Sequence, residues 1–329
     1  MNELKKLFQI EKTPKKGLMA LEWVVLGYIA LTLLIVFFTY TKIANPDAMI
    51  WGRLRIAAIT VALWAVYCMV PCRMTRFLRV CMQMTLLAWW YPDTYEINRM
   101  FPNLDHVFAT WEQSLFGFQP ALVFARNLPS HILSELMDMG YAAYFPMILL
   151  VEIYFFFCRY REFERASLII LSSFFIYYVI FIFLPVAGPQ YYYGAIGLDN
   201  VAHGIFPNVH DYFDLHQQRM VSPGWSDGFF YHIVESAHEA GERPTAAFPS
   251  SHVGIAVVLM LLVAHARNWK FLALLTPFFV FLCFSTVYIQ AHYAIDAIAG
   301  LLTGAAFYFG LLYLTRGMAT DKTKARKSR

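Results

Sequence analysis

The chain has 329 residues, of which 59% are hydrophobic and 15% carry a charged side chain, and its mean hydropathy is +0.50. A soluble domain is nearer a quarter charged, so this composition excludes an ordinary soluble protein and indicates a chain that lies in a bilayer. The formal net charge is only +4, and no nucleic-acid partner is expected. The five cysteines lie in or beside apolar runs, so no disulfide framework is predicted.

Apolar runs long enough to cross a membrane, which takes about 20 residues, follow one another along the chain. The first is too long for a signal-peptide core and lacks a small-residue cleavage site, so we expect an uncleaved anchor. In the last run, Gly300 and Gly304 form a small-xxx-small pair that is expected to serve helix packing. The runs predict an all-α, polytopic transmembrane bundle of about eight spans, although the third is short enough to be re-entrant. They cover residues 18–40, 54–71, 77–92, 133–157, 166–187, 250–266, 270–289 and 292–315.

The positions of the basic residues indicate the orientation, because short cytoplasmic loops accumulate Lys and Arg. With eight spans and both termini inside, the inner segments hold most of the 26 basic residues, including those before Leu18 and those from Arg316 onward. A six- or seven-span arrangement leaves a basic loop on the wrong side. The basic residues left on the outer side are Lys42, Arg53, Arg55, Arg99, Arg126, Arg219 and Arg243. We therefore expect an integral membrane protein with both termini in the cytoplasm.

Two of the predicted outer loops are long. Residues 93–132 include a segment from Asp105 to Phe116 whose mixed faces suit a helix lying in the membrane interface. Residues 188–249 form a connection long enough to be a functional loop or lid. Zinc ligands are conceivable there, but no His-Glu-x-x-His pattern occurs, so solvated histidines and head-group contacts are the preferred interpretation. The candidates were His203, His210, His216, His232, His238, Asp211, Asp214, Glu235 and Glu239. Neither a metal nor a cofactor is predicted.

The first chemical motif, Phe248–Gly254, opens the sixth apolar run. Pro249 and Ser250 are residues that start helices, so free backbone N–H groups and the positive end of the helix dipole are expected here. Such a helix start binds anions readily, and His252 stands in its first turn. Taken alone, an N-cap followed by an interfacial histidine is the better interpretation.

The second motif opens the last apolar run with His292 and Asp296. The i, i+4 spacing places both on one helical face, where a carboxylate–imidazole hydrogen bond would fix the tautomer and suit a nucleophile or base. A first-turn aspartate stabilised by the helix dipole is the simpler alternative. The conjunction is stronger than either motif, because both histidines begin helices on the same predicted side and Arg243 precedes them. Arginine beside a helix N-terminus completes a phosphate cradle.

At these residues the sequence resembles the type 2 phosphatidic acid phosphatase superfamily, the membrane relatives of vanadium haloperoxidases. The family motifs read Lys-x6-Arg-Pro, Pro-Ser-Gly-His and Ser-Arg-x5-His-x3-Asp. The matching residues are Arg243, Pro244, Pro249, Ser250, His252, Ser285, His292 and Asp296. Ser251 stands in the glycine position, and two cations are lost, because Ser236 replaces the lysine and Thr286 the arginine.

The resemblance extends over residues 166–315. The segments Phe183–Tyr191 and Leu115–Pro120 are similar to the branch that contains inositol phosphorylceramide synthases. The family fold implies a six-helix core with two additional N-terminal spans. The chain would then divide into residues 1–75, with the cytoplasmic tail and the added spans, and residues 76–329, the catalytic bundle.

The resemblance also implies roles for the motif residues. His292 would attack phosphorus and form a phosphohistidine, Asp296 would orient it, and His252 would protonate the leaving oxygen. These roles agree with the chemistry of a positioned base, a positioned acid and preorganised positive charge. The phosphate-binding residues would be Arg243, Ser250 and Ser251.

The two lost cations favour a particular substrate charge. A phosphomonoester carries about −1.5 to −2 at neutral pH, whereas a phosphodiester carries one negative charge. We therefore expect a lipid phosphotransferase that moves a phospho-head group from a phospholipid to a lipid alcohol. A monoester phosphatase is the alternative, with Arg219 or Arg126 folding in to restore the charge. A transporter is the rival from another class, but transporters place ionisable residues near the midplane, often within repeats, and no repeat occurs here.

Overall fold

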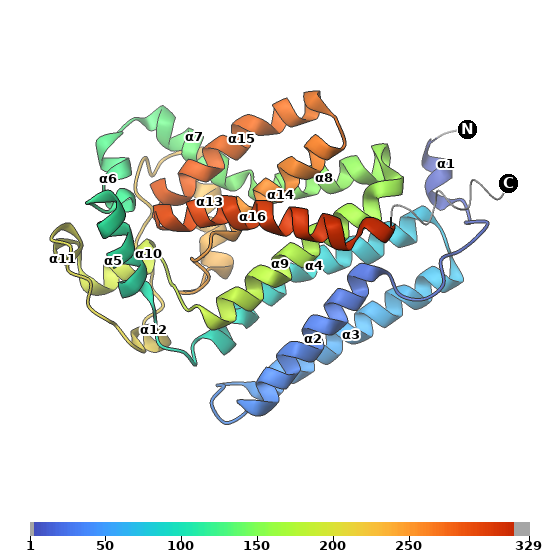
Figure 1. The fold of residues 1–329 in the computed structure, drawn as a ribbon, viewed down its shortest axis with the longest axis horizontal. Coiled ribbons are helices and arrows are strands. Elements are labelled where there is room, and N and C mark those ends of the chain that lie inside the picture. The colour runs from blue at the N-terminus through green and yellow to red at the C-terminus, as the bar shows by residue number, and fades with distance from the viewer. Residues whose placement is uncertain (1–2, 319–329) are drawn as a thin grey trace.

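A computed structural model describes residues 3–318 of the chain, and these residues are helical with no strand among them (Figure 1). The helices are α1 (Glu3–Phe8), α2 (Ala20–Phe38), α3 (Pro46–Met69), α4 (Arg73–Asn98), α5 (Asp105–Phe116), α6 (Pro120–Asn127), α7 (His131–Ala142), α8 (Tyr144–Cys158), α9 (Tyr160–Phe183), α10 (Pro189–Ile196), α11 (Leu198–Ala202), α12 (Tyr212–Leu215), α13 (Phe229–Gly241), α14 (Ser251–His265), α15 (Trp269–Tyr288) and α16 (Ala294–Leu314). Most of the basic C-terminal tail lies outside the described residues.

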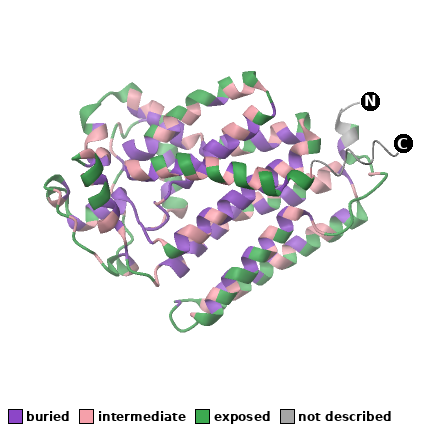
Figure 2. Ribbon diagram, in the orientation of Figure 1, coloured by how far each residue is buried: buried purple, intermediate pink, exposed green. Residues whose placement is uncertain are grey.

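Five helices are long and apolar enough to cross a membrane, namely α2, α3, α9, α15 and α16. The pair α7 and α8, bent by 47° at the break between them, passes the same test when counted as one span. Figure 2 shows buried residues along α9 in the middle of the bundle, whereas α2 and α3 expose more of their length. The predicted polytopic helical bundle is confirmed.

The remaining two predicted spans are the helices α4 and α14. The third run is part of one continuous helix of 26 residues, which is more polar than the other spans. Two of its charged side chains are buried in ion pairs: Arg79 with Glu22 of α2, and Asp93 with Arg53 of α3, where the closest N···O distance is 2.7 Å. Helix α14 is shorter, at 15 residues, and packs against α15 and α16.

Contacts between distant segments define one end of the bundle. They join the N-terminal segment, the turns α3–α4, α8–α9 and α14–α15, and the end of α16. The pairs are Glu11 with Arg76, Lys15 with Glu164, Arg159 with the carbonyl of Ala266, and Arg165 with the carbonyl of Leu312. Helices α5, α6 and α10 to α12 gather at the opposite end (Figure 1). The two predicted motifs lie at that opposite end.

Helices α14 and α16 approach each other closely through glycines. A Cβ atom on Gly304 would lie 2.3 Å from the carbonyl oxygen of Gly254, and one on Gly300 would lie 2.6 Å from the carbonyl oxygen of Ser250. These distances are far below van der Waals contact, so no larger side chain fits. The packing role expected for Gly300 and Gly304 is confirmed, and it brings the starts of the two motif helices together.

The predicted interfacial helix forms as α5, over the residues expected for it. At its first residue, the buried carboxylate of Asp105 accepts hydrogen bonds from the backbone N–H groups of Ala187 (2.6 Å) and Gly188 (2.8 Å) and from the hydroxyl of Tyr293 (2.9 Å). One side chain thus ties α5 to the segment after α9 and to the start of α16.

Candidate active site

His292 lies in the short segment between α15 and α16 and is only 4% exposed. Its Nδ1 lies 2.8 Å from the carbonyl oxygen of Ala247. A carbonyl oxygen can only accept, so Nδ1 carries the proton and Nε2 keeps its lone pair. Burial lowers the pKa of His292 to about 4, against smaller opposing effects of the Ala247 carbonyl and Glu242. The imidazole is therefore neutral at pH 7 and has a free nitrogen.

Asp296 does not make the expected hydrogen bond to the imidazole. Its Oδ2 lies 3.6 Å from Nδ1 of His292 and instead accepts a hydrogen bond from the backbone N–H of Tyr293 at 2.8 Å. Its Oδ1 is buried without a hydrogen-bond partner among the described residues. The carboxylate thus caps the start of α16 and stays within electrostatic range of the imidazole, while the Ala247 carbonyl fixes the tautomer.

His252 faces His292 across the gap between the two helix starts. The ring centroids are 5.7 Å apart, at an interplanar angle of 66°. On its other side the ring of His252 contacts Tyr141 (4.8 Å between centroids) and Tyr144 (4.4 Å), which come from α7 and α8. The structure therefore brings together the two histidines that the sequence predicted as partners.

Ser250 is the N-cap of α14, because its Oγ accepts a hydrogen bond from Val253 N at 3.4 Å. Its backbone N–H donates to the carbonyl of Asp296 at 3.0 Å, which links the two motifs directly. The first intrahelical bond runs from Gly254 N to the Ser250 carbonyl. The amides of Ser251 and His252 precede it and remain available to an anion at the helix start.

The three arginines proposed to bind phosphate differ in the hydrogen bonds that they already form within the protein. Arg243 is partly buried, and its Nη1 donates to the carbonyl of Glu242 at 3.0 Å. Arg219 forms a bidentate pair with Glu235, with N···O distances of 2.6 and 3.1 Å. It is also close enough to affect the pKa of His238. Arg126 is exposed on α6. Of the two proposed replacement cations, only Arg219 lies near the histidines.

The structure places one more histidine near the site, His238. The sequence predicts a solvated loop histidine at this position, and the structure shows a buried one. It projects from α13, is 4% exposed, and lies 5.3 Å from the ring of Tyr141. The signal was present in the helical spacing, because Tyr231, Val234 and His238 share the buried face of α13. No three His, Cys, Asp or Glu side chains within residues 3–318 are arranged to hold a metal ion.

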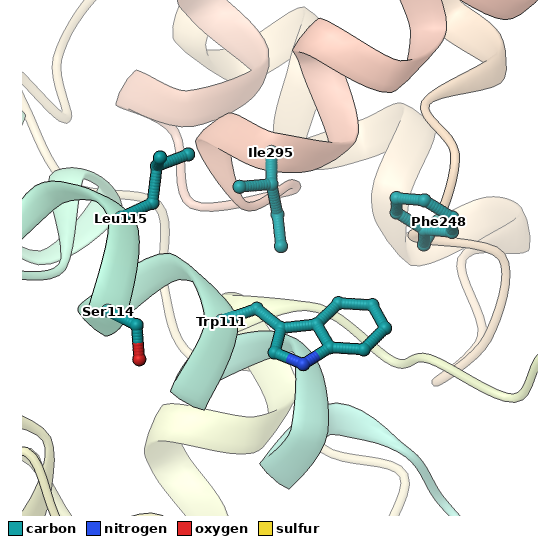
Figure 3. Close-up of a pocket in the computed structure, with 5 residues that line it drawn as sticks. All are labelled: Trp111, Ser114, Leu115, Phe248 and Ile295. Carbon is teal, nitrogen blue, oxygen red and sulfur yellow. The ribbon is translucent and has the colours of Figure 1, made fainter.

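An apolar groove opens beside the histidines. It has a volume of about 450 Å³, and its walls are Trp111, Ser114 and Leu115 of α5, Ile295 of α16 and Phe248 of the loop before α14 (Figure 3). Two of these residues are neighbours of site residues in the chain, since Phe248 directly follows Ala247 and Ile295 directly precedes Asp296.

The fold and the facing histidines define an integral membrane protein with a buried polar site at one end of a helical bundle. A comparison with protein families matches residues 106–309 to the PAP2 superfamily, and this range is more than half of the chain. The chain therefore belongs to the PAP2 superfamily and is a phosphatase or phosphotransferase of that superfamily. Comparisons with curated proteins and with solved structures give no significant match.

Proposed function

We propose that the chain is a lipid phosphotransferase that moves a phospho-head group from a phospholipid to a lipid alcohol through a phosphohistidine on His292. The observation that carries this proposal is the pairing of a neutral imidazole, held through Nδ1 by the Ala247 carbonyl, with His252 at 5.7 Å. A nucleophile with a free nitrogen and an acid across a narrow gap are the two groups that a double displacement needs.

In the first step, Nε2 of His292 attacks phosphorus and the bond to the diacylglycerol oxygen breaks. His252, entering this step protonated, gives its proton to that oxygen and becomes neutral. In the second step, the hydroxyl of the acceptor attacks phosphorus, its proton passes to His252, and the P–N bond breaks with its electron pair returning to His292. Arg243 and the amides of Ser251 and His252 stabilise the phosphoryl oxygens.

The charges around the site support a diester substrate. Arg219 is paired with Glu235, and Arg243 lies within electrostatic range of Glu242, so the two cations are largely offset. Ser236 lies on the exposed side of α13, and the Thr286 hydroxyl donates to the Cys283 carbonyl, so neither position supplies a substitute cation. A substrate with one negative charge fits this balance better than a dianionic monoester.

A monoester phosphatase is the second candidate, and the position of Arg219 favours it. If Arg219 left Glu235 and turned toward the phosphoryl group, the site would gain one positive charge. Glu235→Gln would then raise the rate of phosphatidate hydrolysis, whereas under the transferase proposal it leaves the preference for diesters unchanged.

The test uses purified enzyme and a phosphatidylinositol labelled in its head group, with and without a short-chain ceramide. The transferase produces labelled sphingolipid and diacylglycerol, with little water-soluble phosphate released. His292→Ala, prepared in the same detergent, is the blank. Rapid release of inorganic phosphate from phosphatidate, unaffected by ceramide, would establish the phosphatase instead.

We also propose that both termini lie in the cytoplasm and that the active site faces the opposite, periplasmic or lumenal, side. The arrangement of the bundle supports this orientation, since α1 and the end of α16 lie at one end and the start of α16, next to His292 in the chain, lies at the other (Figure 1). The basic residues of the turns α3–α4, α8–α9 and α14–α15 share the end that holds the termini. The chain division at residue 75 into two added spans and a catalytic bundle likewise remains a proposal.

A further inference from the structure

His238 is a buried histidine whose two ring nitrogens have no hydrogen-bond partner among the described residues. Burial, with a smaller effect of Arg219, lowers its pKa to about 4, so the ring is neutral at pH 7. A neutral imidazole offers one N–H donor and one lone pair. Leaving both unsatisfied is costly, at about 1–3 kcal/mol for each buried group, and such groups in native proteins call for an explanation.

The ring of His238 is connected to the facing histidines through one shared aromatic neighbour. Tyr141 of α7 lies between them, 5.3 Å from His238 and 4.8 Å from His252, measured between ring centroids. His292 is close enough to influence the pKa values of both His238 and His252. Helix α13, which belongs to the long loop before α14, therefore places His238 next to Tyr141, on the α7 side of His252.

A second unpartnered group lies on the facing helix. Asp138 precedes Tyr141 by one turn of α7, is fully buried, and neither carboxylate oxygen has a hydrogen-bond partner among residues 3–318. Glu235, on the same face of α13, lies 4.0 Å from Nδ1 of His238, which is beyond hydrogen-bond distance, and it is committed to Arg219 and to the hydroxyl of Ser222 at 2.7 Å. Between α7 and α13, the two carboxylate oxygens of Asp138 and the two ring nitrogens of His238 thus have no hydrogen-bond partner among the described residues.

We propose that His238, together with Asp138, binds a hydroxyl group of the substrate next to the phosphoryl site. This inference rests on the proposed function. A hydroxyl can accept a hydrogen bond from the imidazole N–H and donate one to the carboxylate, whereas a quaternary ammonium group forms no hydrogen bond with either. The hydroxyl has two possible sources, which are the attacking alcohol and a hydroxyl on the head group of the donor.

The experiment separates the two half-reactions in His238→Leu, His238→Gln and the wild-type enzyme. Phosphoenzyme formation is followed by rapid quench with head-group-labelled phosphatidylinositol and no acceptor. Its decay is followed after short-chain ceramide is added. We expect His238→Leu to slow one step by about tenfold, the scale of one buried hydrogen bond, and His238→Gln to restore most of it. His232→Leu, an exposed histidine on the same helix, is the matched control.

Slower decay assigns the hydroxyl to the acceptor, and slower formation assigns it to the donor head group. The proposal is overturned if both steps slow together, if neither slows, or if the glutamine variant behaves like the leucine variant at an unchanged thermal midpoint. If wild-type enzyme uses phosphatidate and not the phosphodiester, the proposed function fails separately. The same variants are then compared on phosphatidate, where water is the attacking hydroxyl and His238→Leu must slow decay alone.

Discussion

At the scale of single residues, main-chain groups hold the site as much as side chains do. The Ala247 carbonyl sets the tautomer of His292, and Ala246, just before Ala247, and Gln290, two residues before His292, adopt left-handed backbone conformations, with φ of +67° and +65°. Non-glycine residues rarely adopt such values, and those that do cluster at functional sites.

Replacing His292 with Ala is expected to abolish turnover, because no other described imidazole has a nitrogen placed to attack. His252→Ala should slow turnover by about 10² or more, the usual scale for a lost general acid. Lipid product per mole of enzyme is the measurement, and His232→Ala is the control for losing an exposed histidine. Full activity of His292→Ala would rule out the phosphohistidine. Normal elution of each variant on size exclusion shows that the protein is folded.

The candidate site was predictable from sequence where its signals are local. His252, His292 and Asp296 could be found because their spacing places them at helix starts. The carbonyl of Ala247 could not be found, since every residue has a carbonyl and only the fold selects one. His238 shares a helical face with Tyr231 and Val234, but only the packing of α13 against α7, a distant part of the chain, shows that this face is buried.

At the scale of elements, α16 is positioned by α14 through glycines and by α5 through a buried glutamate. Glu112 of α5 accepts a hydrogen bond from the backbone N–H of Ile295 at 3.1 Å, at the free N-terminus of α16. Burial raises the pKa of Glu112 to about 8, against a smaller opposing effect of that hydrogen bond. The contact of Glu112 with Ile295 and the close approach of Gly300 to Ser250 both position the first turns of α16, where Asp296 lies.

Gly304→Ala is expected to destabilise the bundle by about 1–3 kcal/mol or more, because its Cβ would overlap the Gly254 carbonyl. Activity should fall with it, since the starts of α14 and α16 would separate. Gly310→Ala is the matched control on the same helix, because its Cβ would meet nothing within 4 Å. Thermal unfolding in detergent checks both variants. Equal midpoints for the two would contradict the close packing.

The raised pKa of Glu112 predicts a pH-dependent stability. The unfolded chain loses this proton near pH 4.5, but the folded protein keeps it up to about pH 8. The stabilising contribution is therefore complete at low pH and is lost as pH rises through this window. Glu112→Gln, which does not titrate, should gain stability over the wild type as pH rises from about 5 to about 9. Thermal midpoints measure this, with the exposed Glu239→Gln as control. A constant difference would contradict the assignment.

At the scale of the whole molecule, composition and apolar length were enough to predict a polytopic helical bundle. Composition and apolar length predicted the extents of α4 and α14 less well. The polarity of α4 is offset by partners on α2 and α3, and no local window of sequence shows such pairing.

The orientation can be tested with single cysteines in a variant that lacks the five native ones. His216→Cys, on an exposed loop position at the site end, is expected to react with an impermeant thiol reagent in intact cells. Glu162→Cys, near the turn between α8 and α9, should be protected until the membrane is opened. Labelling of both after permeabilisation is the control. The opposite pattern would place the active site in the cytoplasm.

The two buried ion pairs of α4 have a consequence for the order of biosynthesis. Glu22 and Arg53 leave the ribosome before their partners Arg79 and Asp93 exist. A lone charge costs about 2.5–3.5 kcal/mol at the middle of a span on insertion scales, which is an upper bound for Glu22 in the first turn of α2 and for Arg53 in the first half of α3. The first hairpin therefore enters the membrane with unpaired charges that only the next helix neutralises. Translation of α4 completes a three-helix unit, and this unit is the first part of the chain that can leave the insertion machinery with its charges matched.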